Sequence, residues 1–370
     1  MPEEKRMTNF ELLRIIAMMM VVMMHYFLYA DLLPSMTDQV GQENILALLL
    51  ESFCIVAVNV FVMISGYFMI KSRFKFRRFF RLLFQVLFYT LLIPLVLSIF
   101  GLPVIAEQEG VYGIIKYILP VSTMHYWFIT AYVLLYLISP FISIAFEKIE
   151  KVMLRKIILI LLFLFCGIKS FVPFSLNIDY FGYDFGWFIC LYLTGAYIRV
   201  YGLPIFTKKG YGVSIYFLSV ILIFILKIVS HFLYQKTGYF KYYYDIPFHY
   251  NFILVYLGAI GLFCFFMKVK IKEGRVSTFI RGIAPLCLGV YLLHMHVDIR
   301  ENWYQWTKML FGNLHRMGFF GMILNMMITV IFVFTVGILV DFTRSMIFKV
   351  VERNLIDQYE TTKTSNEAKK

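Results

Sequence analysis

Two polar residues interrupt the first long apolar segment, TNFELLRIIAMMMVVMMHYFLYA, which covers residues 8–30. Arg14 and His25 are 11 residues apart, so a helix places them on one face, separated by roughly 16 Å along its axis. A neutral histidine can accept a proton near neutral pH, and an arginine is a permanent cation. The spacing therefore predicts that Arg14 and His25 form the two ends of one elongated site along the face of a membrane-spanning helix.

Each residue also has a structural interpretation. Arg14 could extend to the inner headgroups with help from Glu11, one helical turn earlier. His25 could be a neutral contact between helices. Because ionisable groups are costly within a bilayer, their placement together on one face favours a functional site.

A strongly basic segment, KSRFKFRRFFR, follows the second apolar segment at residues 71–81. Arg78 and Arg81 are spaced i, i+3 and project from one side of a helix. Guanidinium groups bind phosphate through paired hydrogen bonds, so a phosphorylated cytosolic ligand is one interpretation. Anionic lipid is the alternative.

Further polar and aromatic residues lie at the opposite ends of the apolar segments. Trp127 and His125 open the fourth segment, and GVYLLHMHVDIRENW covers the end of the ninth segment and the residues that follow it. In a continuous helix His294 and His296 point about 200° apart, so they cannot share a metal ion, and we predict no metal site. The connections 173–187 and 238–250 combine aromatic rings with polar groups, which suits sugars but also an interfacial aromatic girdle.

The composition requires a membrane. Hydrophobic residues make up 61% of the 370 residues and charged residues 15%, whereas soluble domains are roughly half apolar and a quarter charged. The net charge of +13 would suggest nucleic acid in a soluble protein, but here the cations lie between apolar segments, so we expect no nucleic-acid partner. The five cysteines fall within apolar stretches and predict no disulfide framework.

We therefore predict an all-α integral membrane protein, a bundle of about ten transmembrane helices. One set of alternate connections carries 26 of the 35 lysines and arginines, and the other set carries 7. By the positive-inside rule both termini are cytoplasmic. Residues 1–350 form one membrane domain in this prediction, and 351–370 form a polar, loose cytoplasmic tail. The predicted spans are 8–29, 45–70, 78–100, 126–146, 154–172, 184–200, 211–233, 250–268, 282–298 and 319–345.

Several of these motifs, in this order, resemble membrane acyltransferase family 3, the bacterial O-acyltransferases that modify cell-surface and exported polysaccharides. They are FELLRIIA with the following histidine, NVFVMISGY, the arginine-rich entry to the third span, HYWFITAYVLLYLISP and GVYLLH. Arg14 and His25 match the family's Arg-x10-His element, and Arg78 and Arg81 match its Arg-x-x-Arg element. The resemblance covers about residues 9–343.

The resemblance implies transfer of an acyl group, usually acetyl, from cytosolic acetyl-CoA to a glycan hydroxyl at the outer face of the plasma membrane. It implies that His25 and Arg14 are catalytic and that Arg14, Arg78 and Arg81 contact the CoA donor. Many relatives carry an added extracytoplasmic domain that completes transfer, so we expect this chain to act alone or with a separate extracytoplasmic partner.

Residues near the outer surface are the candidates for binding the glycan acceptor, which is a polysaccharide or a lipid-linked precursor. We select His294, Trp127 and Glu301 from the ninth and fourth spans and their flanks. The competing interpretation is a multi-span glycan flippase, exporter or polymerase without acyl transfer, which would share the aromatic residues and basic loops.

Overall fold

The computed structural model describes residues 6–173, 180–207, 210–312 and 318–367, and in these residues it contains helices and no strands. The all-α prediction is confirmed. The first half of the chain forms α1 (Thr8–Tyr29), α2 (Gln42–Cys54), α3 (Ala57–Met69), α4 (Phe76–Ile99), α5 (Ile105–Glu109), α6 (Val111–Ile118), α7 (Trp127–Lys148), α8 (Lys151–Leu162), the π-helical η1 (Phe163–Gly167) and α9 (Ile168–Phe171).

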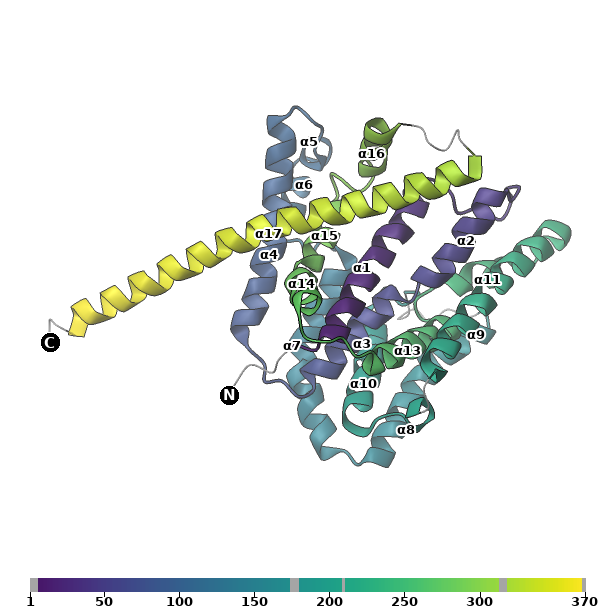
Figure 1. Cartoon of the computed structure of the whole chain (residues 1–370), viewed down its shortest axis with the longest axis horizontal. Coiled ribbons are helices and arrows are strands. Elements are labelled where there is room, and N and C mark those ends of the chain that lie inside the picture. The colour runs from purple at the N-terminus through teal and green to yellow at the C-terminus, as the bar shows by residue number, and fades with distance from the viewer. Residues whose placement is uncertain (1–5, 174–179, 208–209, 313–317, 368–370) are drawn as a thin grey trace.

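The second half begins with α10 (Phe185–Tyr201) and ends with one long helix that crosses the bundle obliquely (Figure 1). Its elements are α10, η2 (Pro204–Thr207), α11 (Tyr211–Thr237), α12 (Lys241–Asp245), η3 (Ile246–Phe248), α13 (Ile253–Lys268), α14 (Arg275–Ile283), η4 (Ala284–Leu286), α15 (Cys287–His294), α16 (Trp303–Phe311) and α17 (Gly318–Glu367). The predicted tail 351–370 begins inside α17, which is helical through Glu367. The division of the chain at 350 and the loose tail stay predictions.

Eight helical segments within the described residues are long and apolar enough to cross a membrane. Two further predicted spans do not meet this test. The helix for 184–200 is α10, with 17 residues, and the segment 154–172 is a run of α8, η1 and α9 that contains three cations. The total of ten and the cytoplasmic placement of both termini stay predictions.

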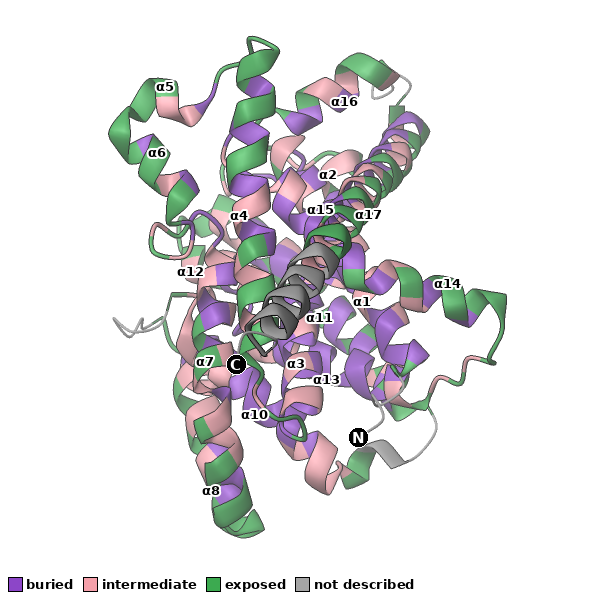
Figure 2. Cartoon of the chain, turned by 90° about the vertical axis from the view of Figure 1, so that its left-hand side faces the viewer, coloured by how far each residue is buried: buried purple, intermediate pink, exposed green. Residues whose placement is uncertain are grey.

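The first helix lies at the centre of the bundle (Figure 1). It packs against α2, α3, α13, α14, α15 and α17, so any side chain on α1 can meet partners from both halves of the sequence. Figure 2 shows that α3, α10 and α13 are mostly buried, while α6 and α8 carry many exposed residues. Exposed apolar side chains on such peripheral helices are the surface expected to face lipid.

Close backbone packing joins α3 to α10. A Cβ atom at Gly66 would lie 2.1 Å from the carbonyl oxygen of Tyr192, and one at Gly195 would lie 2.2 Å from that of Met63. Only glycine permits this approach. Within a membrane, where apolar surfaces gain little by leaving lipid, such backbone contact is a principal source of helix association.

A buried ion pair fixes α17 against the bundle. Asp341 is fully buried, and its carboxylate accepts hydrogen bonds from the guanidinium of Arg344 at 2.6 and 2.9 Å. Gln85 and Tyr89 of α4 donate to the same carboxylate at 2.9 and 3.0 Å. Because both carboxylate oxygens have hydrogen-bond donors, this charge is tolerated away from water and connects α4 to α17.

Candidate functional site

The structure pairs two histidines from opposite ends of the chain. Nδ1 of His25 on α1 lies 2.9 Å from Nε2 of His294, the last residue of α15. The side chain of His294 is buried, whereas His25 is half-buried. The sequence predicts separate roles for these residues, catalysis and acceptor binding, and the structure brings them into direct contact.

The hydrogen bonds of this pair determine which nitrogen of His25 is available. Nδ1 of His294 lies 2.5 Å from the backbone oxygen of Val290, which can only accept, so Nδ1 of His294 carries the proton. In the neutral ring its Nε2 is then the acceptor, and Nδ1 of His25 must donate to it. Consequently Nε2 of neutral His25 holds the free lone pair, and within the described part of the chain it has no hydrogen-bond partner.

Aromatic rings surround the pair. Tyr29, one turn after His25, lies 6.5 Å from its ring, and Trp303 of α16 lies 6.0 Å from Tyr29 and 6.2 Å from His294. Tyr291 contacts His294 edge-on at 6.2 Å. Trp303 is missed at the level of sequence, because it belongs to a short helix beyond the predicted ninth span and no motif marks it.

Arg14 lies towards the other end of α1. Its Nη1 donates to Oε1 of Glu11 at 2.7 Å, and its guanidinium is 5.8 Å from the ring of Phe68. The side chain of Glu11 is 5% exposed, and that of Arg14 keeps 29% of its surface. The buried carboxylate therefore holds the guanidinium while leaving part of it open to a ligand.

The two arginines of the basic segment differ in their contacts. Arg81 makes a forked interaction with Glu352 of α17 at 2.8 and 3.0 Å, and Arg77 reaches the same carboxylate at 3.1 Å. Arg78 is exposed and makes no hydrogen bond or ion pair among the described residues. The structure thus keeps both residues at the start of α4, but only Arg78 is open to a new anion.

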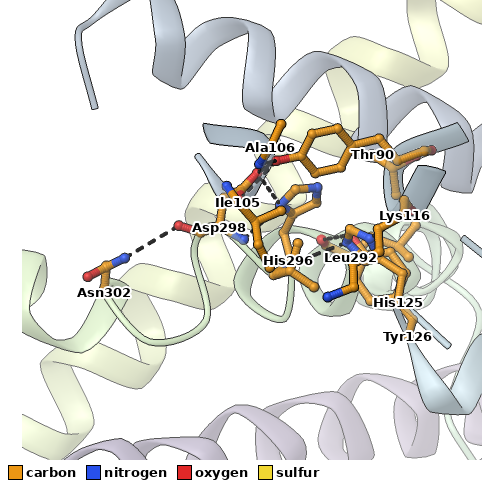
Figure 3. Close-up of polar contacts among 12 residues, drawn as sticks. Thr90, Ile105, Ala106, Lys116, His125, Tyr126, Leu292, His296, Asp298 and Asn302 are labelled. Carbon is orange, nitrogen blue, oxygen red and sulfur yellow. Dashed lines mark hydrogen bonds and ion pairs between the residues drawn. The ribbon is translucent and has the colours of Figure 1, made fainter. Parts of the chain in front are cut away.

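His296 belongs to a different cluster from His294, because α15 ends at His294 and residues 295–302 form turns instead of continuing the predicted helix. Figure 3 shows His296 between His125 and Asp298. The ring centroids of the two histidines are 4.5 Å apart, and Asp298 accepts from the backbone N–H of Ile105 at 2.7 Å and from the hydroxyl of Tyr117.

These contacts attach the α5–α6 hairpin to the 295–302 turns. Nδ1 of His125 donates to the backbone oxygen of Lys116 at 3.1 Å, and its Nε2 accepts weakly from Val297 at 3.5 Å. Burial lowers the pKa of His125 to about 4, so it is neutral at physiological pH. Both nitrogens of His125 are therefore engaged in holding these loops together.

The other two predicted acceptor residues lie apart from the histidine pair. Trp127 begins α7 and packs on Tyr250 and Tyr183, with ring centroids 5.7 and 4.6 Å away. Glu301 is exposed next to Arg300, with 3.7 Å between their charged groups, and lies within electrostatic range of Tyr29. Glu301 is therefore at the rim of the region around His25, and Trp127 is not.

These features define a multi-pass helical membrane protein with a polar site between α1 and α15. The sequence profile of acyltransferase family 3, described as an acyltransferase domain, matches residues 7–342. The chain belongs to this family and is an acyltransferase, as its motifs indicate. Searches of curated proteins and of solved structures found no match to the chain.

Proposed function

We propose that this protein transfers an acetyl group from cytosolic acetyl-CoA to a hydroxyl of an exported glycan in the plasma membrane of a bacterium. Family membership supports O-acyl transfer in general. The single observation that carries the mechanism is the hydrogen-bond order from His25 through His294 to the Val290 carbonyl, because it leaves a lone pair on Nε2 of His25.

The proposed step is direct attack assisted by a general base. Nε2 of His25 removes the proton from the glycan hydroxyl as its oxygen bonds to the thioester carbonyl carbon. The tetrahedral intermediate then collapses, the carbon–sulfur bond breaks, and the imidazolium returns the proton to the departing CoA thiolate. His294 holds the His25 ring in the required orientation and tautomer, which is the contribution of a positioning residue.

The donor is proposed to extend along α1 from the basic segment. Arg78 is an exposed cation of that segment that can meet a CoA phosphate, and Arg81 becomes available when the phosphate replaces Glu352. Arg14, held by Glu11 and partly open, is proposed to contact the donor between that entrance and His25, with which it shares a helix face. This order matches an extended thioester with its phosphates at the cytosolic end.

Transfer of radiolabelled acetyl-CoA by the protein purified in lipid nanodiscs tests the proposal. We expect label in the exported glycan fraction of the producing cells, and loss of transfer in His25→Ala. The matched control is His231→Gln, a histidine on α11 outside the pair. Failure of the wild-type protein to use acetyl-CoA would refute the donor assignment.

The effect of gene deletion separates acyl transfer from glycan export or polymerisation. We expect intact polymer that lacks base-labile acetyl groups. Loss of the whole polymer would instead support a flippase or polymerase, and unchanged acetyl content would refute the proposed acceptor. A requirement for a separate extracytoplasmic protein would appear as transfer in membranes that is lost on purification and restored by the extracytoplasmic fraction.

A further inference from the structure

A second polar region lies away from the histidine pair, around a cavity of about 570 Å³. Its walls come from α11, α12, η3 and the segment before α10, so the structure brings together described residues of the two aromatic connections noted in the sequence, among them Phe181 and Tyr242. A volume of this size is typical of small-molecule sites. The lining residues used below are Phe181, Lys227, Tyr242, Asp245, Phe248 and His249.

Some polar groups of the cavity make no hydrogen bond within the described part of the protein. Nδ1 of His249 is buried and has no hydrogen-bond partner in the described residues, and the carboxylate of Asp245 makes no hydrogen bond there either. Lys227 donates to the backbone oxygen of Tyr244 at 2.8 Å and lies 4.4 Å from the ring centroid of Phe248. A buried nitrogen without a hydrogen-bond partner is costly, so a ligand group that bonds to Nδ1 of His249 would stabilise this region, and the half-buried carboxylate of Asp245 can accept from the same ligand.

The charges around the cavity are of both signs. The carboxylate of Asp245 lies within electrostatic range of Lys227 and of Lys241. Buried Lys169 lies 3.9 Å from the ring centroid of Phe181, which lines the cavity. A hydroxyl group can both donate and accept a hydrogen bond, so a ligand that carries hydroxyls can pair with groups of either charge.

The aromatic part of the wall indicates which chemical class of ligand fits the cavity. Phe181, Tyr242 and Phe248 present aromatic rings beside the polar groups. A sugar ring has C–H faces that pack on aromatic rings and hydroxyls that bond to carboxylate, imidazole and ammonium groups. A hydrocarbon chain would leave Asp245 and His249 unpaired. A saccharide is therefore the ligand class that satisfies both parts of the cavity.

The cavity is separate from His25 but at the same end of the bundle. Tyr250, next to His249, stacks on Trp127, which contacts Phe128 at 5.9 Å; Phe128 in turn contacts Tyr291, the neighbour of His294. This series of rings fills the space between the two regions. The hydroxyl of Tyr244 also donates to the backbone oxygen of Pro34 in the connection that follows α1.

We propose that this cavity binds a sugar unit of the acceptor other than the unit that receives the acyl group. The inference rests on the proposed function. Because rings separate the cavity from His25, one sugar cannot occupy both positions, and the natural acceptor is an oligomer or polymer. The cavity then selects the acceptor by chain length.

Binding without acetyl-CoA tests the site independently of catalysis. The probes are size-fractionated oligosaccharides and single sugars from the exported glycan of the producing cells, measured by saturation-transfer NMR on the protein in nanodiscs. We expect Asp245→Asn and His249→Leu to weaken oligosaccharide binding about tenfold, as the loss of one hydrogen bond predicts. Tyr239→Ala is the matched control, because this aromatic residue of the same connection is 76% exposed and does not line the cavity.

Kinetics with acetyl-CoA provide the second readout. In Asp245→Asn we expect KM for the oligosaccharide to rise about tenfold, with kcat and KM for the single sugar unchanged.

Unchanged oligosaccharide binding and KM in both cavity variants, or an equal effect on single sugars, would overturn the inference. If oligosaccharide binds through the cavity but acetyl transfer is absent, the proposed function fails and the saccharide site stands. If acetyl is transferred but no oligosaccharide binds at the cavity, the saccharide site fails and the proposed function stands.

Discussion

Replacing His294 by leucine tests the proposed orientation of the catalytic histidine. The change removes the acceptor of the His25 Nδ1–H and places an apolar side chain at a position that is 2% exposed. His25 then loses its fixed ring orientation and its preference for the tautomer with a lone pair on Nε2. Loss of such a hydrogen bond costs about 1.5 to 3 kcal/mol, and we expect kcat to fall about 10- to 100-fold.

If His294 had a purely structural role, a different result would be expected. Matched variants therefore distinguish a structural role from the proposed positioning role. In His294→Gln the amide oxygen can accept from His25, and we expect this variant to keep more activity than His294→Leu. In a His25→Ala background, His294→Leu should have little further effect, because the two residues act as a unit.

The assay is single-turnover acetyl transfer at saturating acetyl-CoA, with the thermal midpoint of each variant measured in the same nanodiscs. Full kcat in His294→Leu would refute the reasoning. So would an equal loss in His294→Leu and His294→Gln, or independent losses from His25 and His294 in the double variant.

Contacts elsewhere in the molecule give three further predictions. Glu352→Gln should lower KM for acetyl-CoA by at most about fivefold in initial-rate assays, because it releases Arg81 from an exposed ion pair; an increase would contradict competition with the donor. Asp341→Ala should destabilise the protein by about 3 to 5 kcal/mol in detergent unfolding, because Arg344 keeps a buried, unpaired charge; an unchanged midpoint would show that this pair is not stabilising. The variant Ser35→Cys should react with an impermeant maleimide added to intact cells, and protection in cells but not in lysate would reverse the predicted topology.

Much of the fold follows from the sequence because lipid imposes simple rules. A helix must satisfy its own backbone and bury about 20 apolar residues, so segments such as 8–29 are evident from composition alone. The placement of Arg14 and His25 on one face needs only the helical repeat. Interruptions are harder to predict, because the residues that follow the end of α15 at His294 contact distant parts of the chain: His296 packs on His125, and Asp298 accepts from Ile105.

The partners of the predicted residues could not be read from local sequence. Nothing near His25 identifies His294, and the spacing of Arg78 and Arg81 does not indicate that Glu352 engages only the second. Such pairings depend on how distant helices pack. The aromatic connections 173–187 and 238–250 are suited to sugars by composition, but only the folded chain shows that described residues of both line one cavity.

The sequence distance between His25 and His294 has a consequence for the biosynthesis of the protein. The two rings are 269 residues apart along the chain. At about 5–20 residues per second, a ribosome needs roughly a quarter of a minute to a minute to make that stretch. Throughout this interval α1 can already be inserted in the membrane, but His25 lacks His294, the residue that orients its ring. A nascent or truncated chain is therefore unable to use thioesters efficiently, and activity begins only after nearly all helices have entered the membrane.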